Sequence, residues 1–169
     1  MKLNLGSGPI YLDGYTNIDD KSQFPSARVD MEADIFKLEW EENSCDEIVC
    51  SHIAMYIMGG QDSEEEPNQM RTLLQRWYSW LKPSGRLIME TSNLKKIAEY
   101  ILTTTDPWDL QSSKGLKSMF GWDSTYGHKW AWSPELLIPL FEYAGFSNIE
   151  LGDGYFHSGP RNFLIVGTK

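Results

Sequence analysis

The sequence predicts an α/β protein of the Rossmann-like type: a doubly wound, mostly parallel sheet with a C-terminal antiparallel strand, in a three-layer α/β/α arrangement. Three observations support this prediction: an apolar strand that runs into a Gly-x-Gly turn at residues 3–8, strands and helices that alternate through the middle of the chain, and two closely spaced strands at its end. In such sheets ligands bind beyond the carboxyl ends of the strands, so we expect the site there.

The first strand, Leu3–Leu5, is followed at once by Gly6, Ser7 and Gly8. Glycines after a strand allow bare backbone to approach a ligand, because no Cβ blocks the approach. A second short strand then ends at Asp19, whose two carboxylate oxygens suit the vicinal hydroxyls of a ribose. The pair predicts a site for a small molecule that contains a nucleoside.

The connection between these two strands is short. Only six residues separate Gly8 from Tyr15, whereas the helix that normally crosses between parallel strands takes about a dozen or more. The third glycine of the dinucleotide fingerprint is also missing, since Pro9 and Ile10 follow Gly8. A nicotinamide-dependent reductase is therefore disfavoured.

The middle of the chain alternates between strand and helix. Residues 46–51 form a predicted buried strand, and the turn at 82–85 separates a predicted helix over 70–81 from a strand over 86–90. The apolar residues on one face of that helix are Met70, Leu73, Leu74, Trp77 and Leu81. The strand end at 90–93 is expected beside the cleft, although Glu90 could simply end its strand.

A last helix and a pair of strands close the chain. Ser133 is a good N-cap and Gly145 is typical of a helix C-terminus, so we expect a helix between them. Pro139 lies inside it and should kink or split it. The segments 147–151 and 162–168 are close in sequence, which favours antiparallel pairing.

Composition and charge exclude several functions. The 169 residues fit a single domain over 1–169, and a net charge of −9 without a basic stripe argues against a nucleic-acid partner. Cys45 and Cys50 lack metal-ligand spacing, so we expect buried thiols and no metal site. No secretion signal precedes the first strand and no apolar run could span a bilayer, so we expect a cytoplasmic protein without membrane contact.

Several segments, taken in order, resemble the class I S-adenosylmethionine-dependent methyltransferases. They are LNLGSG at 3–8, GYTNID at 14–19, Ala33–Ile35, CDEIVCSHIAMYI at 45–57, LKPSGRLIME at 81–90 and AGF at 144–146. The match is closest to a short subgroup that lacks the long first helix and has a His-Lys pair before the last helix, here His128-Lys129.

The resemblance implies a role for each matching residue. Leu5, Gly6, Ser7 and Gly8 would bind the amino-acid end of S-adenosylmethionine, Asp19 its ribose, Asp34 and Ile35 its adenine, and Ser51 with His52 would lie beside the sulfonium. The implied reaction is methyl transfer to an oxygen or nitrogen atom of a small-molecule acceptor, such as a saccharide or an amine, with S-adenosylhomocysteine as product. Asp34 could instead simply cap a helix.

Two histidines are the candidate catalytic bases. His52 and His128 are proposed for this role because histidine is suited to proton transfer near neutral pH, although a purely positional role for His52 fits equally well. His157 lies in a glycine-rich loop and is expected to be exposed. Because no clear acid–base pair stands out, an inactive S-adenosylmethionine-binding protein, acting as a sensor or as a subunit of a complex, is the alternative function.

Residues 103–132 show little periodicity, which predicts a lid or substrate-loop insertion. The aromatic residues of this segment are Trp108, Trp122, Tyr126, Trp130 and Trp132. Their faces would suit the acceptor, although the same rings could form a minor core.

Overall fold

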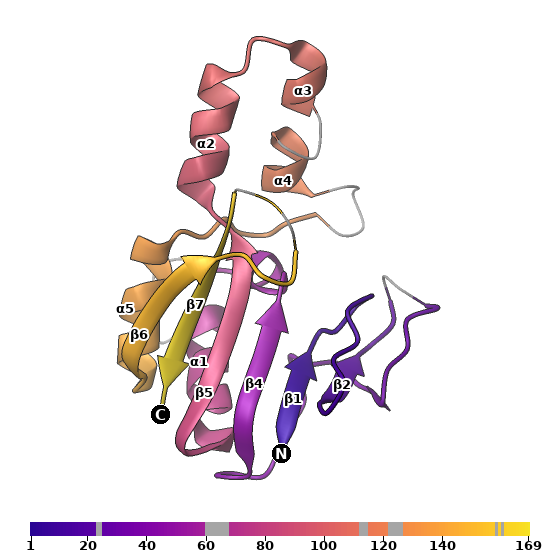
Figure 1. The fold of residues 1–169 in the computed structure, drawn as a ribbon, viewed down its shortest axis with the longest axis vertical. Helices are drawn as coiled ribbons and strands as arrows, with labels where there is room; N and C mark the ends of the chain where they lie inside the picture. The colour runs from indigo at the N-terminus through magenta and orange to yellow at the C-terminus, as the bar shows by residue number, and fades with distance from the viewer. Residues whose placement is uncertain (23–24, 60–67, 112–114, 122–126, 158, 160) are drawn as a thin grey trace.

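The computed structural model describes residues 1–22, 25–59, 68–111, 115–121, 127–157, 159 and 161–169. Within this part of the chain the strands form one seven-stranded sheet in the order β3-β2-β1-β4-β5-β7-β6 (Figure 1). The strands are β1 Lys2–Leu5, β2 Thr16–Asp19, β3 Met31–Glu32, β4 Cys45–Ser51, β5 Leu81–Ser92, β6 Ser147–Asp153 and β7 Asn162–Thr168. β1 to β5 pair in parallel, and β7 is antiparallel to both β5 and β6. The predicted sheet is therefore confirmed.

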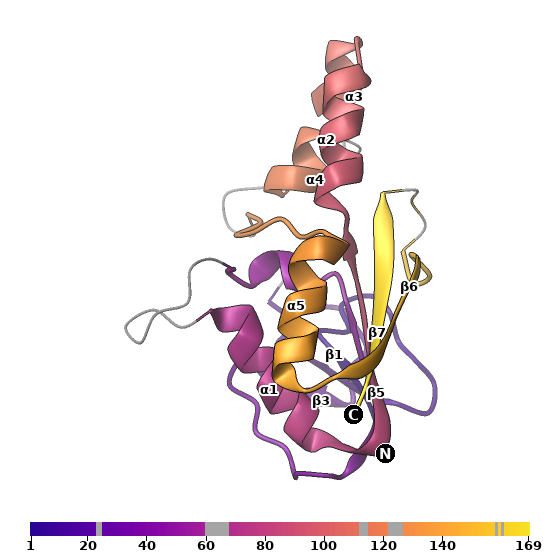
Figure 2. The same ribbon diagram turned by 90° about the vertical axis from the view of Figure 1, so that its left-hand side faces the viewer.

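The helices lie on one face of the sheet and beyond its end. They are η1 Ala54–Tyr56, α1 Gln69–Trp80, α2 Leu94–Thr103, α3 Pro107–Gln111, α4 Leu116–Phe120 and α5 Pro134–Ala144. α1 and α5 pack on each other and cover the same face, whereas α2, α3 and α4 extend past the carboxyl ends of the strands (Figure 2).

The layering differs from the three-layer prediction, because none of the described helices covers the opposite face (Figure 2). The connections from β1 to β2 and from β2 to β3 contain no described helix, and these crossovers would otherwise supply that layer. The connection after β1 lies against the sheet instead. There Asn4 Nδ2 donates to the Ile10 carbonyl at 2.8 Å, and the Tyr15 hydroxyl donates to Glu47.

The core lies between the sheet and the two helices on its covered face. Leu3, Leu5, Ile48, Cys50, Leu87 and Met89 from the strands are buried against Met70, Leu74, Trp77, Leu137 and Phe141 from α1 and α5. Both cysteines are buried, as predicted. Burial raises the pKa of the Cys50 thiol, so it stays protonated in this apolar setting.

The predicted last helix forms, with Ser133 preceding it and Gly145 in the left-handed conformation at φ +105°. Pro139 lies inside it, and of the two predicted outcomes, a kink or a split, the split does not occur because the helix is continuous. The hydrogen bond that Pro139 lacks would end on the carbonyl of Glu135 in the exposed first turn. Packing of Leu137 and Phe141 into the core holds the helix together.

The segment 103–132 is more regular than predicted, because it contains α3 and α4. Of its aromatic residues, Trp122 and Tyr126 lie outside the described residues. None of the helices that the structure describes combines the length and the apolarity that crossing a bilayer requires.

Candidate active site

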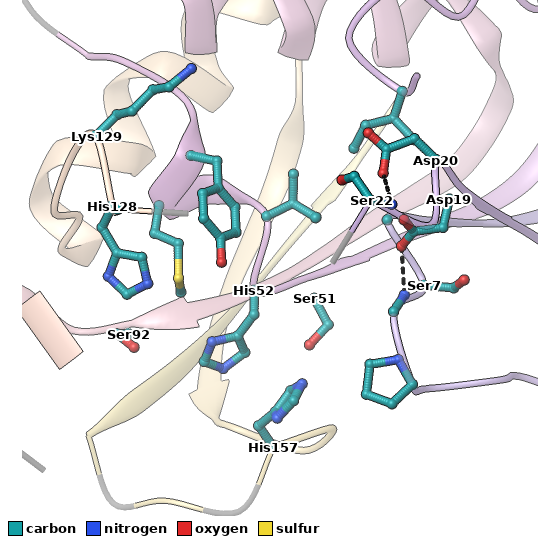
Figure 3. Close-up of a pocket in the computed structure, with 18 of the residues that line it drawn as sticks. Ser7, Asp19, Asp20, Ser22, Ser51, His52, Ser92, His128, Lys129 and His157 are labelled. Atoms are coloured by element: carbon teal, nitrogen blue, oxygen red, sulfur yellow. Dashed lines mark hydrogen bonds between the residues drawn. The ribbon is translucent and has the colours of Figure 1, made fainter. Parts of the chain in front are cut away.

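A cavity of about 750 Å³ lies at the carboxyl ends of the central strands (Figure 3). Of the site residues predicted from the sequence, Gly6, Ser7, Gly8, Asp19, Asp34, Ile35, Ser51, His52 and His128 line it. Leu5 lies outside the lining and is fully buried in the core. The fold therefore gathers residues from the ends of β1, β2 and β4 around one space.

The glycine turn after β1 and the carboxylate at the end of β2 face each other. Gly6 and Gly8 have φ values of +63° and +49°, which favour glycine because a Cβ is disfavoured there. The Gly8 N–H donates to Asp19 Oδ2 at 2.7 Å, and the Lys21 N–H donates to Oδ1 at 3.1 Å. Each carboxylate oxygen keeps a further lone pair for another donor.

Gly6 has a second requirement that the sequence did not reveal. A Cβ at this position would lie 2.2 Å from Cδ1 of Ile53, a residue of the cavity lining. The side chain that approaches the Gly6 backbone closely is therefore one of the protein's own, that of Ile53. Ile53 lines the cavity next to the glycine turn.

Two hydroxyls of the lining lack partners. Ser7 Oγ and Ser51 Oγ are buried and form no hydrogen bond within the described residues. Buried polar atoms are nearly always hydrogen-bonded, so both hydroxyls remain available to a polar ligand in the cavity. A ligand with amino and carboxylate groups would satisfy them.

Asp34 forms helix-start contacts and also lies at the cavity. Its Oδ1 accepts the Phe36 N–H at 3.0 Å, and its Oδ2 pairs with Lys37 at 2.9 Å, as in a helix-start turn. The hydrogen bond from Lys37 is the largest influence on the pKa of Asp34 and holds it below its ordinary value, so the group is charged at neutral pH. Asp34 also lines the cavity, together with Ile35.

His52 is held in an unusual conformation at the end of β4. Its φ of +56° lies in the left-handed region, which costs a residue with a Cβ about 1–2 kcal/mol. Its N–H donates to the Glu90 carbonyl at 2.8 Å, and its ring lies 4.3 Å from the ring of His157. Strain of this kind persists where surrounding contacts enforce it, and it is frequent at functional sites.

The interpretation of Glu90 as a mere strand end is wrong. Its side chain is fully buried, and its carboxylate accepts the backbone N–H groups of Tyr155 and Phe156 at 2.6 Å and of His157 at 2.8 Å. Burial by itself would raise the pKa of Glu90, but the nearby His52 ring and the hydrogen bonds from these N–H groups outweigh it and hold the pKa below its ordinary value. The only signal in the sequence was a charged residue in an otherwise apolar strand.

All three histidines of the chain line the cavity, so the expectation that His157 is an exposed loop residue is wrong. His128 Nδ1 lies 3.1 Å from the Ser118 carbonyl, and its ring meets Tyr56 edge-on at 5.6 Å. Burial lowers the pKa of His128 and of His157. Both are therefore neutral near pH 7 and able to accept a proton.

The described tryptophans of segment 103–132 do not line the cavity. Trp108 is 81% exposed and Trp130 is 37% exposed, whereas Trp132 is buried and donates to the Ala54 carbonyl at 2.7 Å. Trp132 thus belongs to the core, as in the alternative interpretation. The lining residues that this segment does supply are Lys117, Ser118, Gly127, His128 and Lys129.

No protein-family model and no curated protein matches the chain. Several solved structures do match the chain. A methyltransferase dependent on S-adenosylmethionine from Archaeoglobus fulgidus superimposes with a TM-score of 0.63 at 18% identity, over 99% of this chain and 85% of that one. A methyltransferase of the same kind from Mesorhizobium loti superimposes with a TM-score of 0.59 at 13% identity, over 99% of this chain and 90% of that one.

Human N-acetylserotonin methyltransferase, solved in complex with S-adenosylmethionine, gives a TM-score of 0.59 at 18% identity. The match covers 99% of this chain and 47% of the human one. At such identities the likeness establishes the fold, which is the fold that the sequence resemblance predicted.

Proposed function

We propose that this protein is an S-adenosylmethionine-dependent methyltransferase that acts on an oxygen or nitrogen atom of a small molecule. The observation that carries the proposal is the pairing of the Gly8 N–H with Asp19 Oδ2 at 2.7 Å, at one end of a cavity of about 750 Å³. The carboxylate faces the glycine turn from which a nucleoside ligand would be held. The fold shared with methyltransferases of this class supports the same conclusion.

The residues of the cavity lining could each bind one part of the cofactor. Asp19 would accept hydrogen bonds from the ribose hydroxyls, and Asp34 with Ile35 would lie at the adenine. The unpartnered hydroxyls of Ser7 and Ser51 would bond to the amino-acid end. The bound cofactor supplies an electrophilic methyl group on a positively charged sulfur.

The residues of the chain would then mainly position the acceptor and exclude water. Aligning two bound reactants contributes about 7 to 11 kcal/mol to lowering the barrier. The acceptor atom would form the new bond with its own lone pair, and the bound cofactor would keep the electron pair of the broken bond on sulfur and leave as S-adenosylhomocysteine. The acceptor proton passes to His52 or His128, which would contribute about 100- to 10,000-fold.

Two measurements on the purified protein test this function. Calorimetric titration with S-adenosylhomocysteine should show binding, and Asp19→Asn should weaken it by about 1–3 kcal/mol through lost charged hydrogen bonds. Asp30→Asn is the matched control, because Asp30 also accepts backbone and side-chain hydrogen bonds, from Asn17, but lies outside the cavity lining. No binding to the wild-type protein would contradict the proposal.

Turnover is tested separately with S-adenosylmethionine labelled in its methyl group and a broad panel of small acceptors. Formation of a labelled product would support the proposed methyltransferase activity. Tight cofactor binding without any product would instead support the sensor or complex subunit that the sequence left as the alternative.

A further inference from the structure

The charged residues that line the cavity are divided between its two ends (Figure 3). Asp19 and Asp20 lie together at one end, and Asp34 follows the neighbouring strand β3. His128 and Lys129 lie at the other end, with His52 and His157 between the two ends (Figure 3). This division separates an acidic end, which suits the donor groups of the cofactor, from a basic end left for the acceptor.

Arg161 contributes the basic side chain best placed to bind a ligand. It immediately precedes β7, and its carbonyl accepts the Asn93 N–H at 2.7 Å, which holds it beside the end of β5. Its guanidinium carbon lies 5.2 Å from the ring centroid of Tyr100 in α2. The side chain thus has a fixed support while lining the cavity.

Arg161 and Lys129 have no anionic partner in the part of the chain that the structure describes. Within the described residues neither forms an ion pair, and Arg161 Nε is buried without a hydrogen-bond acceptor. Elsewhere the basic residues Lys2, Lys37, Arg76, Lys82, Arg86, Lys95 and Lys96 all pair with carboxylates. Lys21, Arg28 and Lys169 also form no ion pair among the described residues, but unlike Arg161 and Lys129 they lie outside the cavity lining.

The protein supplies no described carboxylate for these cations at their end of the cavity. Glu90 is the nearby acidic residue on β5, but it is fully buried, lies outside the lining, and has its oxygens occupied by backbone N–H groups. His128 and His157 are neutral near pH 7 and act there as hydrogen-bonding groups. Among the described residues without an ion pair, fixed positive charge at this end therefore comes from Arg161 and Lys129.

We infer that the methyl acceptor carries a carboxylate or phosphate group, which Arg161 binds at the basic end of the cavity while the reacting atom lies beside His52. The inference rests on the proposed function, since it names the acceptor of the same site. A guanidinium matches either anion with two parallel hydrogen bonds. The same charges repel a protonated amine.

Calorimetry with four aromatic probes tests the preference for an anion, with and without saturating S-adenosylhomocysteine. Phenyl phosphate and benzoate are the anions, benzamide is the neutral probe, and benzylamine is the cation. At least one anion should bind tenfold or more tightly than benzamide, and benzylamine more weakly than benzamide. The stronger of the two anions identifies the group. Benzamide or benzylamine binding as tightly as both anions would overturn the inference.

Variants of Arg161 assign the effect to this residue. Arg161→Gln should weaken binding of the preferred anion at least tenfold and leave the affinity for S-adenosylhomocysteine unchanged, whereas Arg161→Lys should retain part of the anion affinity. Arg28→Gln is the matched control, because Arg28 also lies over a tyrosine ring, that of Tyr11 at 3.8 Å, but outside the cavity lining. Unchanged anion affinity in Arg161→Gln would overturn the inference.

The two proposals fail in different ways. If S-adenosylhomocysteine binds and the anions do not, the methyltransferase proposal stands and the anionic acceptor is excluded. If the anions bind in a manner that depends on Arg161 while S-adenosylhomocysteine does not bind, the anion site stands and the proposed reaction fails.

Discussion

His52 Nε2 lies 3.5 Å from Oε1 of Glu90, a buried residue behind the cavity lining. The same oxygen accepts the His157 N–H at 2.8 Å. One buried carboxylate therefore connects the end of β4, the strand β5 and the segment that follows β6. This arrangement makes Glu90 a positioning residue for both histidines that it contacts.

The anchoring role of Glu90 predicts a loss of stability when its oxygens are removed. Glu90→Ala leaves three backbone N–H groups without an acceptor and should lower the free energy of unfolding by about 3 kcal/mol or more. Glu90→Gln keeps one acceptor oxygen and should lose roughly half as much. Urea unfolding measures both variants. Wild-type stability in Glu90→Ala would show that the segment is not held by this residue.

Because His52 adopts a left-handed conformation, variants at this position can distinguish its structural role from its chemical role. His52→Gly should be about 1 kcal/mol more stable than His52→Ala, because only glycine adopts φ +56° without strain. Both variants should lower turnover far more than affinity for S-adenosylhomocysteine if the imidazole acts on the acceptor. Equal losses in turnover and cofactor affinity would instead mark His52 as structural. Denaturation, calorimetry and the labelled-methyl assay supply the three readouts.

Two glycines with positive φ distinguish conformational strain from steric clash. Gly14→Ala introduces a Cβ at φ +81° with no atom within 4 Å, so it should cost only the strain of about 1 kcal/mol. Gly6→Ala adds a contact of 2.2 Å with Ile53 and should cost a further 1–3 kcal/mol or so. Equal free energies of unfolding for the two variants would mean that Ile53 moves aside freely.

The stability of the protein should fall on acidification. Because burial lowers the pKa of His128 and of His157 in the folded protein, the unfolded chain binds protons that the folded chain does not once the pH drops below the ordinary value of 6.5. The free energy of unfolding should therefore decrease from about pH 6.5 downward. Glu90 adds to the loss below its ordinary pKa of 4.5, since its folded pKa is lower than that value.

Urea unfolding between pH 5 and pH 8 checks this pH dependence. His128→Asn and His157→Asn should each flatten the decline, because each removes one group that titrates differently in the two states. A profile that stays level from pH 8 to pH 5 in the wild-type protein would contradict the account.

The sheet and one end of the site could be predicted from local sequence patterns, because these features depend on residues that are close together in the sequence. The glycine turn at 6–8 and the carboxylate of Asp19 could be identified from strand ends alone. The role of Glu90 could not, since its partners at 155–157 lie 65 to 67 residues away. His157 and Arg161 enter the cavity only because β7 returns beside β5, a tertiary pairing that no local pattern specifies.

The layering was misjudged for a similar reason. The short connection after Gly8 already indicated that one crossover helix is missing, but helices on both faces were still expected from the alternation of strands and helices. The face of the sheet without described helices is covered by the loops around β1 and β2. Asn4 and Glu47 form hydrogen bonds with residues of the connection between these two strands.

The most direct test of the central claim is a crystal structure of the protein grown with S-adenosylhomocysteine. Nucleoside density is expected at the carboxyl ends of β1, β2 and β4, with the ribose hydroxyls within hydrogen-bonding distance of Asp19 and the backbone of residues 6–8 against the ligand. A nucleoside bound elsewhere, or an Asp19 carboxylate turned away from it, would contradict the account.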